Sequence, residues 1–193
     1  MNSNLIGSQN FKAYFYLFFA TLFWAGNFTI GKFASIENIP PYSLSFLRWL
    51  LVWLILFPFT YKEILKLKSE ISKNLTLFFI LGFSSVGVFS AFTYNALAHT
   101  QVINASLFNT AIPAMIIFLC FLLKIEKTNR FQIIGLILSV FGILSIITKL
   151  DLSILLSLNF NKGDLIMIGG VITWGLYSSF LKNKKFTLPL LTL

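Results

Sequence analysis

Long apolar runs alternate with short polar segments along the whole chain. A transmembrane helix needs about 20 residues to cross a hydrocarbon core of about 30 Å, and it must bond its own backbone groups because lipid offers no partners. Six stretches meet this requirement, at approximately residues 13–34, 42–61, 75–97, 104–124, 131–148 and 164–182. The pattern therefore predicts an all-α, polytopic transmembrane helix bundle of about six spans.

The composition indicates the same environment. Hydrophobic residues make up 57% of the 193-residue chain and charged residues only 11%, and the mean hydropathy is +0.84. Soluble domains carry about a quarter charged residues, and a core of this size cannot hide so much apolar surface. The lipid bilayer is therefore the expected partner. The net charge of +9 does not indicate binding to nucleic acid, because the basic residues are scattered between apolar runs.

Positive charges fall mainly on one side of the predicted bundle. The N-terminal tail and the even-numbered connections hold eleven Lys and Arg residues, against three in the odd-numbered connections. Because cytoplasmic loops carry the excess of basic residues, we expect a multi-pass protein of the cell membrane, in a bacterial inner membrane, with a cytoplasmic N-terminus. The first run is longer than a signal-peptide core and contains Asn27 and Lys32, so we expect it to be retained as a span.

The first and sixth predicted spans resemble each other. In each, a tryptophan precedes a lysine by eight residues, Trp24 with Lys32 and Trp174 with Lys182, and a proline follows the next polar stretch. Because each unit holds five spans, an odd number, the second enters the membrane from the opposite side, as in the inverted repeats of many secondary transporters. We expect a cytoplasmic tail at 1–12, a first repeat at 13–149, a connecting loop at 150–163 and the start of a second repeat at 164–193.

Several short motifs follow one another in an order that resembles a known family. They are Phe23-Trp24-Ala25-Gly26-Asn27, Pro40-Pro41, Ser45-Phe46-Leu47-Arg48-Trp49, Ala96-Leu97 leading to Asn104-Ala105-Ser106-Leu107, then Pro113, Glu126, Gly135 and Gly142. The sequence resembles the EamA domain of the drug/metabolite transporter superfamily. The resemblance implies ten spans in two five-span repeats around a central solute pathway. It also implies transport of a small-molecule solute, such as the export of amino acids or other metabolites.

Compared with that family, the chain supplies one complete repeat and the first span of the next, and it stops at Leu193. We therefore expect a truncated or partial product whose partner is the missing second half or another copy. The alternative function is a non-transporting membrane component, or a half-transporter that requires a partner chain. The solute, the direction of transport and the coupling ion are left open by the sequence.

Polar and aromatic residues inside the spans are the candidates for a solute pathway, because such groups are costly when they face lipid. Trp24 and Asn27 share a face of the first span with Gly31, and Trp174 and Tyr177 share a face of the sixth. We expect these two faces to meet in the interior of the bundle. The alternative is a seam between helices in which Asn27 bonds a neighbour.

Further candidates lie in the second to fourth spans. Arg48 is the only charged residue well inside a span, and it either binds an anionic solute group or extends along its stem to the outer headgroups. Tyr94 and Asn95 are candidates for solute contact, on a span whose small residues also indicate tight packing. Asn109 lies one turn before Pro113, which removes a backbone donor and predicts a kink.

Other kinds of chemistry have little support. The single Cys120 and the single His99 provide no metal-ligand set and no nucleophile with its base, and no span interior contains Asp or Glu. We expect no catalytic residue, no metal and no cofactor, so the chain is not expected to be an enzyme. In the fifth span, Gly135, Ser139 and Gly142 predict a small-residue face on which a neighbouring helix packs closely.

Overall fold

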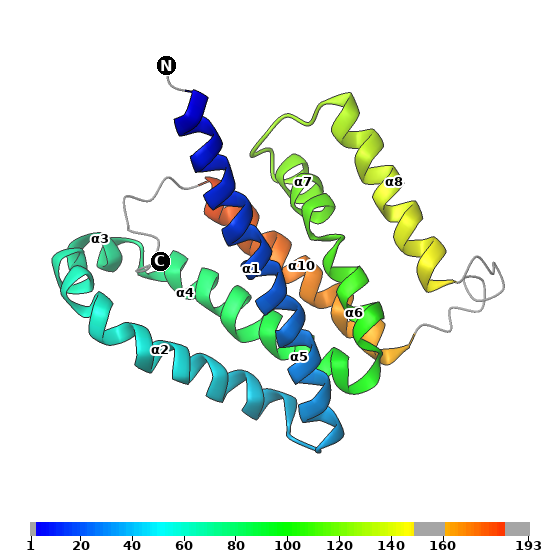
Figure 1. Cartoon of the computed structure of the whole chain (residues 1–193), viewed down its shortest axis with the longest axis horizontal. Coiled ribbons are helices and arrows are strands. Elements are labelled where there is room, and N and C mark those ends of the chain that lie inside the picture. Colours follow the sequence, from blue (N-terminus) through cyan, green and yellow to red (C-terminus); the bar gives the residue numbers. More distant parts are fainter. Residues whose placement is uncertain (1–2, 149–160, 184–193) are drawn as a thin grey trace.

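The computed structural model describes residues 3–148 and 161–183, and nearly all of them are helical (Figure 1). In chain order the helices are α1 (Ser3–Ile36), α2 (Pro41–Lys66), α3 (Lys68–Lys73), α4 (Leu75–Gly82), η1 (Phe83–Phe89), α5 (Ser90–His99), α6 (Val102–Asn109), α7 (Ile112–Leu122), α8 (Arg130–Ile147) and α10 (Lys162–Asn183). Most of the expected connecting loop at 150–163, and the part of the expected second repeat after residue 183, lie outside the described residues.

Five of the six expected spans are helical stretches that are long and apolar enough to cross a membrane. They are Phe11–Ile36, Pro41–Lys66, Leu75–His99, Val102–Leu122 and Lys162–Lys182. The expected fifth span corresponds to α8, whose apolar stretch Arg130–Gly142 is shorter within the part of the chain that the structure describes. The prediction of an all-α, polytopic transmembrane bundle is confirmed.

The third and fourth spans are irregular near their middles. The third consists of α4, η1 and α5 in direct succession, and η1 is a π-helix, in which each N–H bonds one residue further back than in an α-helix. The fourth is divided into α6 and α7 at Thr110 and Ala111, just before Pro113 in the first turn of α7. Because proline has no backbone N–H, the carbonyl of Asn109 lacks its usual helical donor.

The helix α10 occupies the centre of the bundle, where it packs on α5, η1, α6 and α7 (Figure 1). Its Met167 is fully buried in the core. Glycines allow this close approach: a Cβ at Gly163 would lie 2.7 Å from the carbonyl oxygen of Ala96, and one at Gly175 would lie 2.7 Å from Cγ of Met115. Small residues let helix backbones approach closely in lipid, so α10 docks directly on the preceding helices.

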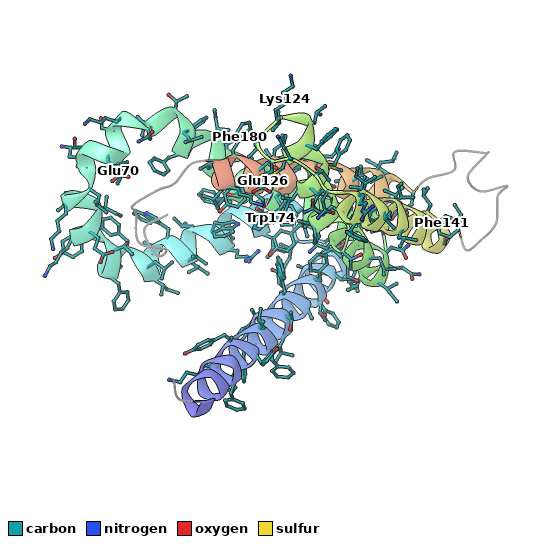
Figure 2. All side chains as sticks on the ribbon, turned by 90° about the horizontal axis from the view of Figure 1, so that it is seen from above. Glu70, Lys124, Glu126, Phe141, Trp174 and Phe180 are labelled. Carbon is teal, nitrogen blue, oxygen red and sulfur yellow. The ribbon has the colours of Figure 1, made fainter. Side chains whose placement is uncertain are left out.

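Two elements lie at the edge of the bundle. Figure 2 shows the N-terminal part of α1 projecting away from the other helices, and its side chains from Phe11 to Phe23 are exposed. The other peripheral element is α8, which packs on α6 and α7. A Cβ added at Gly135 or Gly142 would have no atom within 4 Å. Within the described chain both glycines therefore face open space, and close packing of a neighbour on this face stays a prediction.

Candidate functional site

A cavity of about 210 Å³ lies between α1, α2, α5 and α10, and we call it the central cavity. Its lining consists of Trp24, Asn27 and Phe28 from α1, Arg48 and Trp49 from α2, Phe89 from η1, Ser90, Thr93 and Tyr94 from α5, and Trp174 from α10. Trp174 lies in the middle of the bundle (Figure 2). The cavity therefore gathers polar groups from the first three spans and an aromatic residue from the sixth.

A hydrogen-bonded chain of three side chains crosses this cavity. Arg48 Nη1 donates to the hydroxyl oxygen of Tyr94 at 3.0 Å. That hydroxyl donates in turn to Oδ1 of Asn27 at 2.6 Å. The three residues belong to α2, α5 and α1, so these hydrogen bonds join three spans through side chains alone. Its direction follows from the chemistry, because a guanidinium group only donates.

The helix α1 can reach Tyr94 because of Gly31, one turn after Asn27. A Cβ at Gly31 would lie 2.8 Å from Cδ1 of Tyr94 and 2.8 Å from Cδ1 of Leu97. Real Cβ contacts are not this short, so only glycine fits without a shift of its neighbours. The absence of a side chain at Gly31 thus lets α1 pack closely on α5, which places Asn27 within hydrogen-bond distance of the Tyr94 hydroxyl.

The surroundings of Arg48 are aromatic and lack a carboxylate. Its guanidinium carbon lies 5.2 Å from the ring centroid of Trp49, and Trp49 Nε1 is itself held by a 2.8 Å hydrogen bond to Oγ of Ser90. An ion pair of the described residues joins Lys182 to Glu126, away from this cavity. Among the described residues, Arg48 therefore has no acidic partner at ion-pair distance.

Aromatic rings from η1 and α10 form part of the cavity wall. The ring of Trp174 lies 4.6 Å from that of Phe89 and 5.2 Å from that of Tyr177, measured between centroids. Both contacts are tilted, an arrangement that aromatic pairs favour over direct face-to-face stacking. The Trp174 side chain is thereby packed from two sides, which fixes one wall of the cavity.

Five of the sequence-predicted residues meet at the central cavity: Trp24, Asn27, Arg48, Tyr94 and Trp174. The other three do not line it. Asn95 is directed elsewhere, since its Nδ2 donates to the Tyr42 hydroxyl at 3.0 Å near the start of α2.

Tyr177 and Asn109 line two neighbouring cavities. The first, of about 460 Å³, lies between α2, α3, α4, η1 and α10, and Tyr177 shares it with Trp49 and Trp174. The second, of about 610 Å³, lies between α1, α6 and α7, and there Asn109 and Pro113 face Trp24. Asn109 Oδ1 is buried and has no hydrogen-bond partner within the described chain. Tryptophans are thus shared between the central cavity and each of its neighbours.

A second polar network, at the opposite end of α5 from η1, was missed by sequence reasoning. Lys32 Nζ donates to the carbonyl oxygens of Leu97 and Thr100, each at 2.9 Å. The Thr100 hydroxyl donates at 2.7 Å to Oδ1 of Asp164, which is 6% exposed. These bonds tie α1 and α10 to the C-terminus of α5, where unpaired carbonyls attract a cation. The eight-residue spacing from Trp24 singles out Lys32, but spacing alone cannot identify its acceptors.

Long apolar helices around a buried polar cavity define a polytopic helical membrane protein. The EamA-like transporter family matches residues 11–148, and the chain belongs to this family. It is 25% identical over 169 residues to an uncharacterized transporter of Bacillus subtilis, YyaM, covering 88% of this chain and 55% of the relative. It is 32% identical over 171 residues to an uncharacterized transporter of Archaeoglobus fulgidus, covering 88% of this chain and 57% of the relative. The chain thus spans little more than half the length of these relatives, and no solved structure matches it.

Proposed function

We propose that this chain takes part in moving a small solute across the cell membrane, and that the central cavity is a binding site along the solute pathway. The observation that carries the proposal is the Arg48–Tyr94–Asn27 chain of hydrogen bonds inside membrane-spanning helices. Polar and charged groups at this depth are costly and are typical of solute pathways and binding sites. Membership of the EamA-like transporter family supports the same function.

The neighbouring cavities support a path in several steps. Trp49 and Trp174 line both the central cavity and the larger cavity next to Tyr177, while Trp24 lines both the central cavity and the one next to Asn109. These indole rings therefore form the walls between adjacent cavities along the proposed path. The proposed solute is an amino acid or another small metabolite, and the proposed direction is export.

The proposed organisation follows the repeat pattern. Residues 13–149 form the first repeat, and α10 begins a second, inverted repeat that is docked on the first. Transporters with this symmetry place the substrate site at the interface between repeats, which is where Trp174 meets the residues of α1, α2 and α5. We propose that the N-terminus is cytoplasmic and that the protein lies in a bacterial inner membrane. We also propose that it is not an enzyme.

A second candidate is a half-transporter that requires a partner chain. The observation that favours it is the length of the relatives, of which this chain covers 55% and 57%. Under this proposal the remaining wall of the pathway comes from a second half or from another copy. The two candidates share the central cavity and differ in what completes it.

Solute binding to the purified chain tests the function. Because Cys120 is buried, we expect it to react with a fluorogenic maleimide on unfolding and so to report thermal stability in detergent while amino acids and other metabolites are screened. A bound solute raises the melting temperature by mass action. Thr93→Phe fills the central cavity and should abolish the increase, whereas Leu138→Phe on the exposed face of α8 should not. Stabilisation that persists in Thr93→Phe, or no stabilising solute at all, would overturn the proposal.

A further inference from the structure

We propose that the central cavity recognises a carboxylate, and that Arg48 is the group that binds it. The inference rests on the proposed function and adds the chemical class of the solute. The guanidinium donates to the hydroxyl of Tyr94, a residue that is 3% exposed and is bonded to Asn27. Arg48 therefore points into the bundle instead of extending toward the lipid headgroups.

The charge of Arg48 favours the binding of an anion. A positive charge inside a membrane span is costly unless it is paired. Within the described residues the carboxylates do not supply the pair: Glu37, Glu63, Glu70 and Glu126 lie in connections or near helix ends, and Asp164 near the start of α10 accepts from Thr100. A solute anion would provide it.

The guanidinium also has donors to offer. An arginine side chain carries five N–H groups in a planar fork that matches the two oxygens of a carboxylate. The described structure uses one nitrogen of the fork, Nη1, for the bond to Tyr94. The guanidinium carbon also lies 5.2 Å from the centroid of the Trp49 ring, and this cation–π contact uses no N–H donor.

The number of charges favours a carboxylate over a phosphate. Arg48 is the only cationic side chain among the ten residues that line the central cavity. One cation balances the single charge of a carboxylate, while a phosphate monoester carries about −1.5 to −2 at neutral pH. The volume of about 210 Å³ fits a solute smaller than a drug molecule. The rings of Trp24, Trp49 and Trp174 suit an apolar body behind the carboxylate.

Two isosteric probes test the inference: 4-fluorobenzoate and its neutral counterpart 4-fluorobenzamide. Their affinities are measured by ¹⁹F NMR on the whole chain in nanodiscs of zwitterionic lipid. One hydrogen-bonded charge pair predicts at least about tenfold tighter binding of the benzoate. Arg48→Gln should remove this preference, and Arg48→Lys should keep part of it. Lys62→Gln is the matched control, because it removes a charge from an exposed position on the same helix, outside the cavity.

Each outcome bears on the proposal. Equal affinity of the wild-type chain for both probes overturns it even if Arg48→Gln fails to fold, and so does a preference that survives in a folded Arg48→Gln. Tighter binding of phenyl phosphate than of benzoate overturns the assignment to a carboxylate. The function itself is tested separately: neutral solutes that stabilise the chain and are excluded by Thr93→Phe leave the pathway intact while the carboxylate assignment fails.

Discussion

Replacing Gly31 by alanine, compared with the same replacement elsewhere on α1, tests how closely α1 packs on α5. A methyl group at this position would lie 2.8 Å from atoms of both Tyr94 and Leu97. The Tyr94 ring would have to move, and its hydroxyl would lose the 2.6 Å bond to Asn27. Gly26→Ala is the matched control, because it adds the same methyl to the same helix where no atom lies within 4 Å.

The magnitude follows from the comparison of the two variants. Both gain the higher helix propensity of alanine, at most about 1 kcal/mol, so this contribution cancels. Forcing a methyl group into a packed contact costs about 1–3 kcal/mol, and a lost hydrogen bond costs about 1 kcal/mol more. Gly31→Ala should therefore be about 2–4 kcal/mol less stable than Gly26→Ala. In a chain of this size this lowers the melting temperature by about 4–16 °C.

The assay uses the single cysteine of the chain. Cys120 is 3% exposed, and its thiol lies 3.6 Å from Oγ of Ser179 on α10. Labelling by a fluorogenic maleimide during heating therefore reports separation of α7 from α10. A Gly31→Ala variant that melts with Gly26→Ala would refute the reasoning, because it would mean that α1 does not approach α5 as closely as described.

Three further predictions follow from features at other places in the chain. Lys32→Met removes the cation from the C-terminus of α5 and should cost about 1–2 kcal/mol, measured by the same melting assay against exposed Lys12→Met; equal melting of the two would contradict it. In a Cys120→Ala background, Lys66→Cys should resist a membrane-impermeant maleimide added outside cells, whereas Glu37→Cys should react; external labelling at position 66 would reverse the proposed orientation. Under the half-transporter proposal, the chain alone in liposomes should insert without saturable uptake of labelled amino acids and metabolites, and saturable uptake above empty liposomes would refute that proposal.

The hydrophobic pattern could predict the spans because burial in lipid is a property of long segments. It could not predict their interior irregularities. The π-helical segment Phe83–Phe89 has no proline, and its two serines and one glycine also occur in regular α-helices, so its sequence does not predict the wider helix. The division of the fourth span has a local cause in Pro113 and could be anticipated. The open surface at Gly135 could not, because a small residue permits close packing without providing a neighbour.

The candidate site could be predicted only in part from the sequence. Residues on one helix share a face by the 3.6-residue period, so Trp24 and Asn27 could be placed together. Contacts between helices depend on their rotation and relative height, which the period does not give. Arg48 and Tyr94 are 46 residues apart and meet only in the folded bundle. Tyr94 and Asn95 are adjacent, yet they point to different partners because successive helical residues diverge by about 100°.

The central position of α10 has a consequence for synthesis in the cell. Chains emerge from the ribosome N-terminus first, so α5, η1 and α7 enter the membrane before the helix that they surround. Until then the surfaces that later enclose Met167 and Ser179, both 0% exposed, remain in contact with lipid or with the insertion machinery. The core formed by the earlier helices is therefore completed only when α10 enters the membrane. A pause in translation before residue 161 would hold the nascent protein with its core still open.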